Sequence, residues 1–209
     1  MSKHRKFLTE YELTDFFSAI DNMRDFLIFG LIFEAGLRPG EVGYNKRASV
    51  SPLLIRNIED ILLDRDNLIH IDRAKHHPEG RDAILINNVI IEELKKFVLA
   101  SIDSVSKDKY IEYIKSIRDK PLFLSQKNNI ISLRQVQALF KKYCEKAGIS
   151  NSKQHPHILR HSHAVSALKN GVDLESIRQN LGHDNIKTTS VYLEMTMDDA
   201  IESYKKANN

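Results

Sequence analysis

The chain has 209 residues, 42% of them hydrophobic and 28% charged, with a formal net charge of +3. Such a composition supports a proper core and argues against global disorder, while the small positive charge is compatible with nucleic-acid binding without indicating it. The single cysteine, Cys144, excludes a disulfide framework and a cysteine-based zinc site, and it favours a reducing, cytoplasmic compartment.

The beginning of the chain predicts two helices and a constrained turn. The basic N-terminus lacks the apolar stretch of a signal peptide. Thr9 is the expected N-cap of the first helix, and a second helix, apolar nearly all round but too short to span a bilayer, is expected at about residues 23–35. Gly36 supplies a stop for this helix, and Pro39 disfavours helical geometry at the preceding residue. Arg38 therefore lies on a constrained turn just past a buried helix.

The next part of the chain predicts a small sheet. After a polar loop at 43–52, short β-like runs lie at about 58–62, 68–71 and 83–86. The stretch DRAKHHPEGRD, between the last two runs, is basic and rich in turn-forming residues, which indicates a hairpin tip. We expect these runs to form a three-stranded antiparallel sheet.

From Asn88 onward the pattern is helical. Helices are expected at about 88–102, 106–118, 132–147, 157–170, 173–181 and 185–195, with a final amphipathic segment at about 197–206. No internal repeat and no low-complexity linker interrupts the chain. The expected fold class is α+β, mostly α-helical, with a small sheet near the front of the chain.

The stretch HPHILRHSH, at 155–163, holds four histidines and one arginine. On a helix, His157, Arg160 and His161 would share one face. A metal site there is disfavoured, because no glutamate lies between the two histidines and Arg160 would place a permanent positive charge beside the cation. Two interpretations remain open from these residues alone. The face is either a solvated basic surface or a phosphate site, in which guanidinium and imidazole bind an anion.

Two further motifs give the chain a resemblance to the tyrosine recombinases, the phage integrase family. The family's pattern is H-x-x-R, then L-G-H, then a tyrosine nine residues after that histidine. Here these are His157 and Arg160, Leu181-Gly182-His183, and Tyr192. The family's first arginine stands in a G-L-R-x-x-E context, matched here by GLRPGE at 36–41. The resemblance extends from about residue 8 to residue 195, and it implies the fold of the tyrosine-recombinase catalytic domain.

The resemblance implies phosphoryl transfer between DNA strands, as in DNA integration, excision or inversion. Tyr192 would attack the scissile phosphate and form a 3′-phosphotyrosyl intermediate, so neither a metal nor another cofactor is expected. Arg38 and Arg160 would bind the non-bridging phosphate oxygens, and His183 would add a hydrogen bond. His157 would do the same or exchange a proton with the nucleophile.

The resemblance also implies supporting groups around this site. Lys75, on the expected hairpin between the two arginines, would protonate the departing 5′ oxygen. Glu41 and His161 would orient the catalytic groups without touching the substrate. Candidate DNA contacts are Arg73 and Arg81 near the hairpin tip, and Lys46 and Arg47 in the polar loop, where a solvated loop is the alternative.

The implied partner is double-stranded DNA with specific recombination sites, bound by a homotetramer that the segment at 197–206 helps to assemble. No membrane partner is expected. Only about eight residues precede the first expected helix, whereas most members carry an N-terminal core-binding domain. We expect residues 1–209 to form a single catalytic domain without that domain, either as a fragment of a longer recombinase or as a natural single-domain one. Relaxation of DNA by a type IB topoisomerase and a catalytically silent DNA-binding relative are the alternatives.

Overall fold

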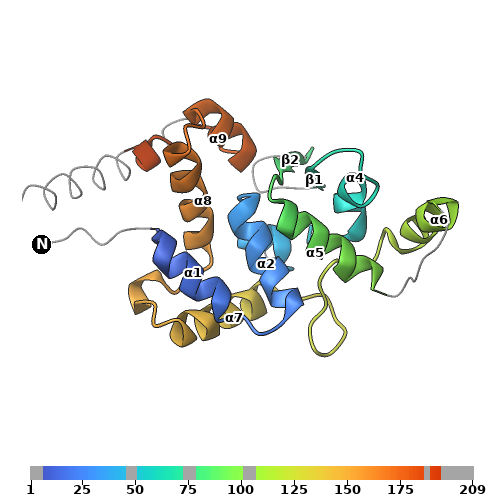
Figure 1. Ribbon diagram of the computed structural model, residues 1–209, viewed down its shortest axis with the longest axis horizontal. Coiled ribbons are helices and arrows are strands. Elements are labelled where there is room, and N and C mark those ends of the chain that lie inside the picture. Colours follow the sequence, from blue (N-terminus) through green and yellow to red (C-terminus); the bar gives the residue numbers. More distant parts are fainter. Residues whose placement is uncertain (1–6, 46–50, 73–78, 101–106, 186–188, 194–209) are drawn as a thin grey trace, which may run out of the picture.

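The computed structural model describes residues 7–45, 51–72, 79–100, 107–185 and 189–193, which are mostly helical (Figure 1). In chain order the helices are α1 (Glu10–Ser18), α2 (Met23–Glu34), α3 (Pro39–Val42), α4 (Glu59–Leu62), α5 (Asn88–Leu99), α6 (Lys107–Ile117), α7 (Leu133–Lys146), α8 (His157–Lys169) and α9 (Leu174–Leu181). The 3₁₀ turn η1 (Ile55–Ile58) directly precedes α4, and the 3₁₀ turn η2 (Asn151–Lys153) lies between α7 and α8. Residues 189–193 are helical as well. None of the described helices is long and apolar enough to cross a membrane.

Helix α2 lies at the centre of the core, in contact with α5, α7 and α8. It begins at the cap residue Asn22, whose side chain accepts a hydrogen bond from the backbone N–H of Asp25. It ends before Gly36, which has a φ of +64°. A Cβ at Gly36 would stand 2.7 Å from the Leu181 side chain and 2.9 Å from that of His163. The end of α2 is therefore held closely against α8 and α9.

The sheet has two antiparallel strands among the described residues, β1 (Leu68–Ile71) and β2 (Arg81–Ile84). In its register Leu68 pairs with Ile84, and Ile71 pairs with Arg81. The chain between them contains the predicted hairpin tip. The α+β, mostly helical class is confirmed, with a smaller sheet than expected.

The prediction of a third strand at 58–62 is wrong, because η1 and α4 occupy this region. Ile58, Ile61 and Leu62 are all buried. In the sequence IEDIL their spacing of three and four residues places them on one side of a helical turn, and the residues do not alternate as in a half-buried strand. The turn still belongs to the sheet region, because His70 of β1 lies 2.8 Å from Asp60 of α4.

Helix α8 separates two clusters of buried apolar residues. Near its N-terminus Ile158 and Leu159 pack into the large central core, whereas Ala164 and Val165 pack into a smaller cluster. The smaller cluster consists of Phe7, Ala164, Val165, Ile177, Leu181 and Tyr192. Arg160 is between these two groups in the sequence of α8 and is 4% exposed. This buried charge lies where α8 meets the ends of α2 and α9.

Candidate active site

The turn after α2 fixes Arg38 beside Glu41. Arg38 is the N-cap of α3, and Pro39 is the first helical residue, a position that suits proline because its N–H is not needed there. The Glu41 carboxylate reaches back over this turn. It accepts hydrogen bonds from the Arg38 backbone N–H at 2.7 Å and from its Nη1 at 2.9 Å. The side chain of Arg38 is 16% exposed, so part of the guanidinium remains open to a ligand.

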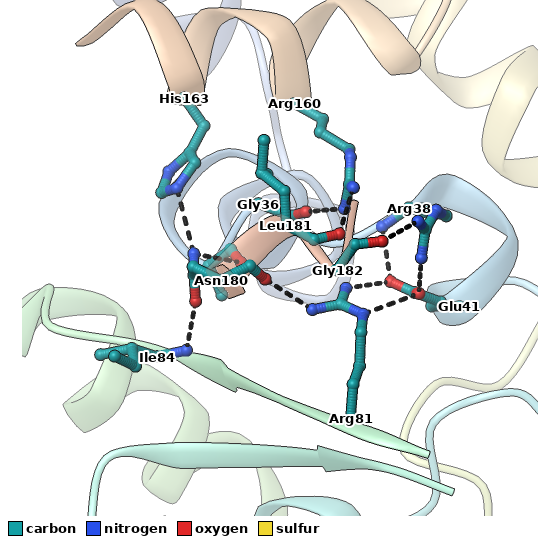
Figure 2. A network of polar contacts seen from close by, with 11 residues as sticks. Gly36, Arg38, Glu41, Arg81, Ile84, Arg160, His163, Asn180, Leu181 and Gly182 are labelled. Atoms are coloured by element: carbon teal, nitrogen blue, oxygen red, sulfur yellow. Dashed lines mark hydrogen bonds and ion pairs between the residues drawn. The ribbon is translucent and has the colours of Figure 1, made fainter. Parts of the chain in front are cut away.

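The C-terminal end of α9 collects three arginines (Figure 2). Three consecutive carbonyl oxygens each accept a hydrogen bond from a different guanidinium. The pairs are Asn180 with Arg81, Leu181 with Arg160, and Gly182 with Arg38. The last carbonyls of a helix have no partner within the helix and carry its negative partial charge, so cations are stabilised there. Gly182 ends the helix with a φ of +60°, and His183 follows directly.

Arg160 is held by backbone groups on two sides. Its Nη1 donates to the Gly36 carbonyl and its Nη2 to the Leu181 carbonyl. Burial, followed by the nearby charge of Arg38, lowers the pKa of Arg160 to about 9, so the side chain is still a cation at neutral pH. The close approach at Gly36 allows the carbonyl of this turn to reach Arg160. Two positive charges from separate parts of the sequence are thereby held side by side.

His183 is oriented by a threonine. Its Nδ1 lies 3.0 Å from Oγ1 of Thr189, which is 0% exposed. Burial, followed by the positive charge of Arg160, lowers the pKa of His183 to about 4. His183 is therefore neutral at pH 7 and can offer one N–H to an anion without adding a third full charge.

Tyr192 lies between two histidines. Its hydroxyl oxygen is 3.0 Å from Nδ1 of His161, and its ring is stacked with that of His183 at a centroid distance of 6.5 Å. Tyr192 is 3% exposed. Burial raises its pKa, and the positive charge of Arg160 acts in the opposite direction. The tyrosine is thus within the electrostatic reach of Arg160.

His157 is the first residue of α8 and is exposed. Desolvation and then the charges of Arg160, His155 and Arg38 lower the pKa of His157. His157 is thus within electrostatic reach of both arginines. It is therefore available to a bound anion as a neutral imidazole.

Most of the residues singled out from the sequence lie around this one site. The structure brings together Arg38, Glu41, His157, Arg160, His161, His183 and Tyr192. Arg81, expected to contact DNA, has a side chain that is 5% exposed and pairs with Glu41. Four other predicted residues and one predicted segment lie outside the described residues, namely Lys46, Arg47, Arg73, Lys75 and residues 197–206. Their predicted roles stay predictions. No group of three metal-ligating side chains is found in the part of the chain that the structure describes.

Sequence reasoning did not identify three residues of the site. Thr189 holds His183, and Asn180 has a side chain 3.3 Å from Nε2 of His163. Burial lowers the pKa of His163 to about 4, although its place on a different helix face from His157 and His161 predicted a surface residue. A signal existed only for Thr189, which lies in the polar turn between His183 and Tyr192.

Residues 58–198 match the family model described as the phage integrase family. The chain belongs to this family. Similar family members include tyrosine recombinase XerA of Pyrococcus horikoshii, which is 32% identical over 97% of this chain and 61% of its own length. Tyrosine recombinase XerC of Thermodesulfovibrio yellowstonii is 31% identical over 88% of this chain and 54% of its own length. The chain thus spans less than two thirds of these relatives, and the predicted family is confirmed.

Solved structures of phage integrase family members have the same fold. The crystal structure of XerA recombinase matches all of this chain and 66% of its own, with a TM-score of 0.70 and 23% identity. XerH recombinase, solved with a palindromic difH substrate, has a TM-score of 0.66 and 19% identity, covering 100% of this chain and 55% of its own. A lambda integrase dimer bound to a COC′ core site has a TM-score of 0.57 and 19% identity, covering 92% of this chain and 60% of its own.

Proposed function

We propose that this chain carries the catalytic domain of a tyrosine recombinase, which cuts and rejoins DNA strands through a 3′-phosphotyrosyl intermediate. The observation that supports it most is the junction of α2, α8 and α9. There Arg38 and Arg160 are held by neighbouring carbonyls of one helix end, and Arg160 lies within electrostatic reach of Tyr192. Two fixed cations, one of them within electrostatic reach of a tyrosine, form a suitable site for a phosphodiester.

The two arginines stabilise the charge that develops during the reaction. Attack on a phosphodiester places additional negative charge on the non-bridging oxygens. Arg160 and Arg38 are held by the protein before substrate binds, so little reorganisation is needed at the moment of reaction. His183, neutral and oriented by Thr189, donates an N–H to the same phosphate. Removing one such donor typically slows a reaction by on the order of 10²-fold or more.

The phenol of Tyr192 needs a group that accepts its proton. His161 is positioned for this role, because its Nδ1 is 3.0 Å from the phenol oxygen. The Tyr192 oxygen bonds to phosphorus, its proton passes to His161, and the bond from phosphorus to the 5′ oxygen breaks. Lys75 protonates the departing 5′ oxygen in this proposal. Rejoining reverses these steps with the 5′ hydroxyl of a second strand, so the bond energy is conserved in the intermediate.

Double-stranded DNA with specific recombination sites is the proposed partner. XerH and the lambda integrase were solved bound to DNA, which supports a DNA substrate for this chain. We place this activity in the cytoplasm, on nucleoid or mobile-element DNA. A homotetramer on DNA is also proposed, with residues 197–206 contributing to it. Deleting residues 196–209 is expected to weaken assembly on DNA, and unchanged tetramers in sedimentation analysis would contradict this part of the proposal.

The experiment that tests the function uses nicked duplex DNA with a randomised core. After cleavage beside the nick, the short 5′ fragment diffuses away and the covalent complex accumulates. We expect a denaturant-resistant protein–DNA adduct with the wild type and none with Tyr192→Phe. Failure of the wild type to form an adduct would contradict the proposal. An adduct accompanied by relaxation of supercoiled DNA, but never by strand exchange between two sites, would indicate a topoisomerase instead.

A further inference from the structure

Arg81, the first residue of β2, is fully engaged inside the protein. Its Nη2 and Nε donate to the two oxygens of Glu41, at 2.6 Å and 3.2 Å. Its Nη1 donates to the carbonyl oxygen of Asn180 at 2.7 Å. Every nitrogen of the guanidinium therefore has a partner within the chain (Figure 2). Only 5% of the side chain is exposed. Its geometry is that of a buried ion pair with Glu41.

The Glu41 carboxylate is completed by Arg81. Each of its oxygens accepts one hydrogen bond from Arg38 and one from Arg81. A carboxylate has about four lone-pair positions, so the two arginines together satisfy it. Glu41 is 0% exposed, and a buried charge without its full set of partners is strongly unfavourable. The contact between Arg38 and Glu41 thus depends on Arg81.

Asn180, near the C-terminus of α9, contacts both the first and the last residue of β2. Its carbonyl oxygen accepts from Arg81, and its side-chain oxygen accepts from the backbone N–H of Ile84 at 2.8 Å. Its side-chain nitrogen donates to the Ala35 carbonyl at 3.4 Å, at the end of α2. The hairpin strand, the turn that precedes Arg38 and the helix end that holds the arginines are connected through this one residue.

We propose that Arg81 is a positioning residue for strand cleavage: it fixes Glu41, and through Glu41 the guanidinium of Arg38, while joining β2 to α9. This inference rests on the proposed function, because its effect is measured on DNA cleavage. Arg81 itself contacts no substrate in this account.

The charges around Glu41 determine the pH dependence of cleavage that is expected when Arg81 is lost. The carboxylate faces the cations of Arg38, Arg81 and Arg160, and it lies within electrostatic reach of His157. Burial raises the pKa of Glu41, but the arginines outweigh burial, and Arg81 makes the largest lowering contribution. Without Arg81 the pKa of this carboxyl rises, and a protonated carboxyl accepts fewer hydrogen bonds from Arg38. Cleavage by such a variant should therefore increase as the pH rises.

The test measures the rate constant of covalent cleavage at saturating nicked DNA, and separately the DNA affinity. We expect Arg81→Met to lower the rate constant by on the order of 10- to 100-fold, as loss of a supporting hydrogen-bond partner does at other sites. Its rate should recover relative to the wild type as the pH is raised from about 6 to about 8.5, since deprotonation restores the Glu41 carboxylate. Arg81→Lys, which retains the charge, should cleave faster than Arg81→Met and lack this pH dependence.

A double-mutant cycle with Glu41→Gln tests whether Arg81 acts through Glu41. If it does, Arg81→Met changes cleavage by no more than about twofold in the Glu41→Gln background. The control for lost positive charge is Arg65→Met, because Arg65 is 56% exposed and lies outside the site. The DNA affinity of Arg81→Met should equal that of this control.

Four results would overturn the inference. The first is an unchanged cleavage rate constant in Arg81→Met, and the second is full additivity of Arg81→Met and Glu41→Gln in the double-mutant cycle. The third is a cleavage rate that falls only in proportion to the folded fraction of Arg81→Met at every pH. The fourth is a loss of DNA affinity with no change in the cleavage rate constant. The last result would assign Arg81 to DNA contact. Absence of an adduct with the wild type would overturn the proposed function as well, whereas equal rates in wild type and Arg81→Met would overturn this inference alone.

Discussion

The phenol oxygen of Tyr192 lies 3.0 Å from Nδ1 of His161, the residue that directly follows the buried Arg160 in the sequence. The sequence motif predicted His161 as a support for the catalytic groups. On the basis of this contact we propose His161 as the proton acceptor for the proposed nucleophile. In the tautomer that carries its proton on Nε2, the Nδ1 atom accepts directly from the phenol.

Replacement of His161 tests this role. His161→Phe retains a ring but removes the acceptor, so we expect adduct formation to slow by about 100-fold or more. The measurement is the single-turnover rate with nicked DNA. His155→Phe, at an exposed histidine just before α8, serves as the matched control and should cleave at the wild-type rate. Equal rates in the two variants would exclude proton transfer through His161.

Thr189 is expected to set the orientation of His183. Thr189→Val keeps the shape of the side chain but loses the hydroxyl 3.0 Å from Nδ1. Loss of one hydrogen bond of about 1 kcal/mol should slow cleavage about fivefold without lowering DNA affinity. Thr189→Ser keeps a hydroxyl and should restore most of the rate. A Thr189→Ser variant as slow as Thr189→Val would show that the methyl group, and not the hydrogen bond, matters.

His163 should make folding stability dependent on pH. Its surroundings are the Asn180 amide, the Phe33 carbonyl and the charge of Arg160, and burial lowers its pKa from 6.5 to about 4. The unfolded chain therefore binds a proton at this residue before the folded chain does as pH falls. Its stabilising contribution is complete above pH 6.5 and is lost as pH falls toward about 4.

The corresponding measurement is urea unfolding of wild type and His163→Phe across this range. The difference in unfolding free energy should change by up to about 1.4 kcal/mol per pH unit below the unfolded-state pKa. Comparing the two proteins cancels the other titrating groups that they share. Parallel stability curves would contradict a buried neutral imidazole at this position.

Gly36 and Gly148 form a matched pair for the packing around the site. Both have positive φ, at +64° and +67°. A Cβ at Gly36 meets Leu181 at 2.7 Å, whereas none of the described atoms lies within 4 Å of a Cβ at Gly148. Gly148→Ala should cost about 1 kcal/mol from backbone strain alone, and Gly36→Ala should cost more and also reduce cleavage. Thermal unfolding and the adduct assay check both, and equal losses would contradict the close packing of this turn.

The sequence predicted the parts of the site that follow from local order. Arg38 after a buried helix, His157 and Arg160 on one helix face, and the interval from His183 to Tyr192 are all readable from spacing. The meeting of these segments came from the family resemblance, since periodicity alone places no helix beside another. The burial of Arg81 was not predictable, because its partners Glu41 and Asn180 are 40 and 99 residues away in the chain.

The error at the expected third strand has a different origin. Residues 58–62 read IEDIL, in which the apolar residues are spaced by three and four positions, and this spacing fits a helical turn and not the alternation of a strand. Here Asn57 donates to the carbonyl of His70, which attaches the helical turn to β1 and leaves its apolar side chains in the core.

The central claim is that Tyr192 becomes covalently joined to a DNA 3′ phosphate, and peptide mapping of the adduct tests it most directly. The tryptic peptide at 188–205 contains both Tyr192 and Tyr204, so fragmentation has to assign the modified residue. We predict a nucleotide on Tyr192 after nuclease treatment, absent in Tyr192→Phe. A nucleotide on Tyr204 or any other residue, or an adduct that persists in Tyr192→Phe, would contradict the account.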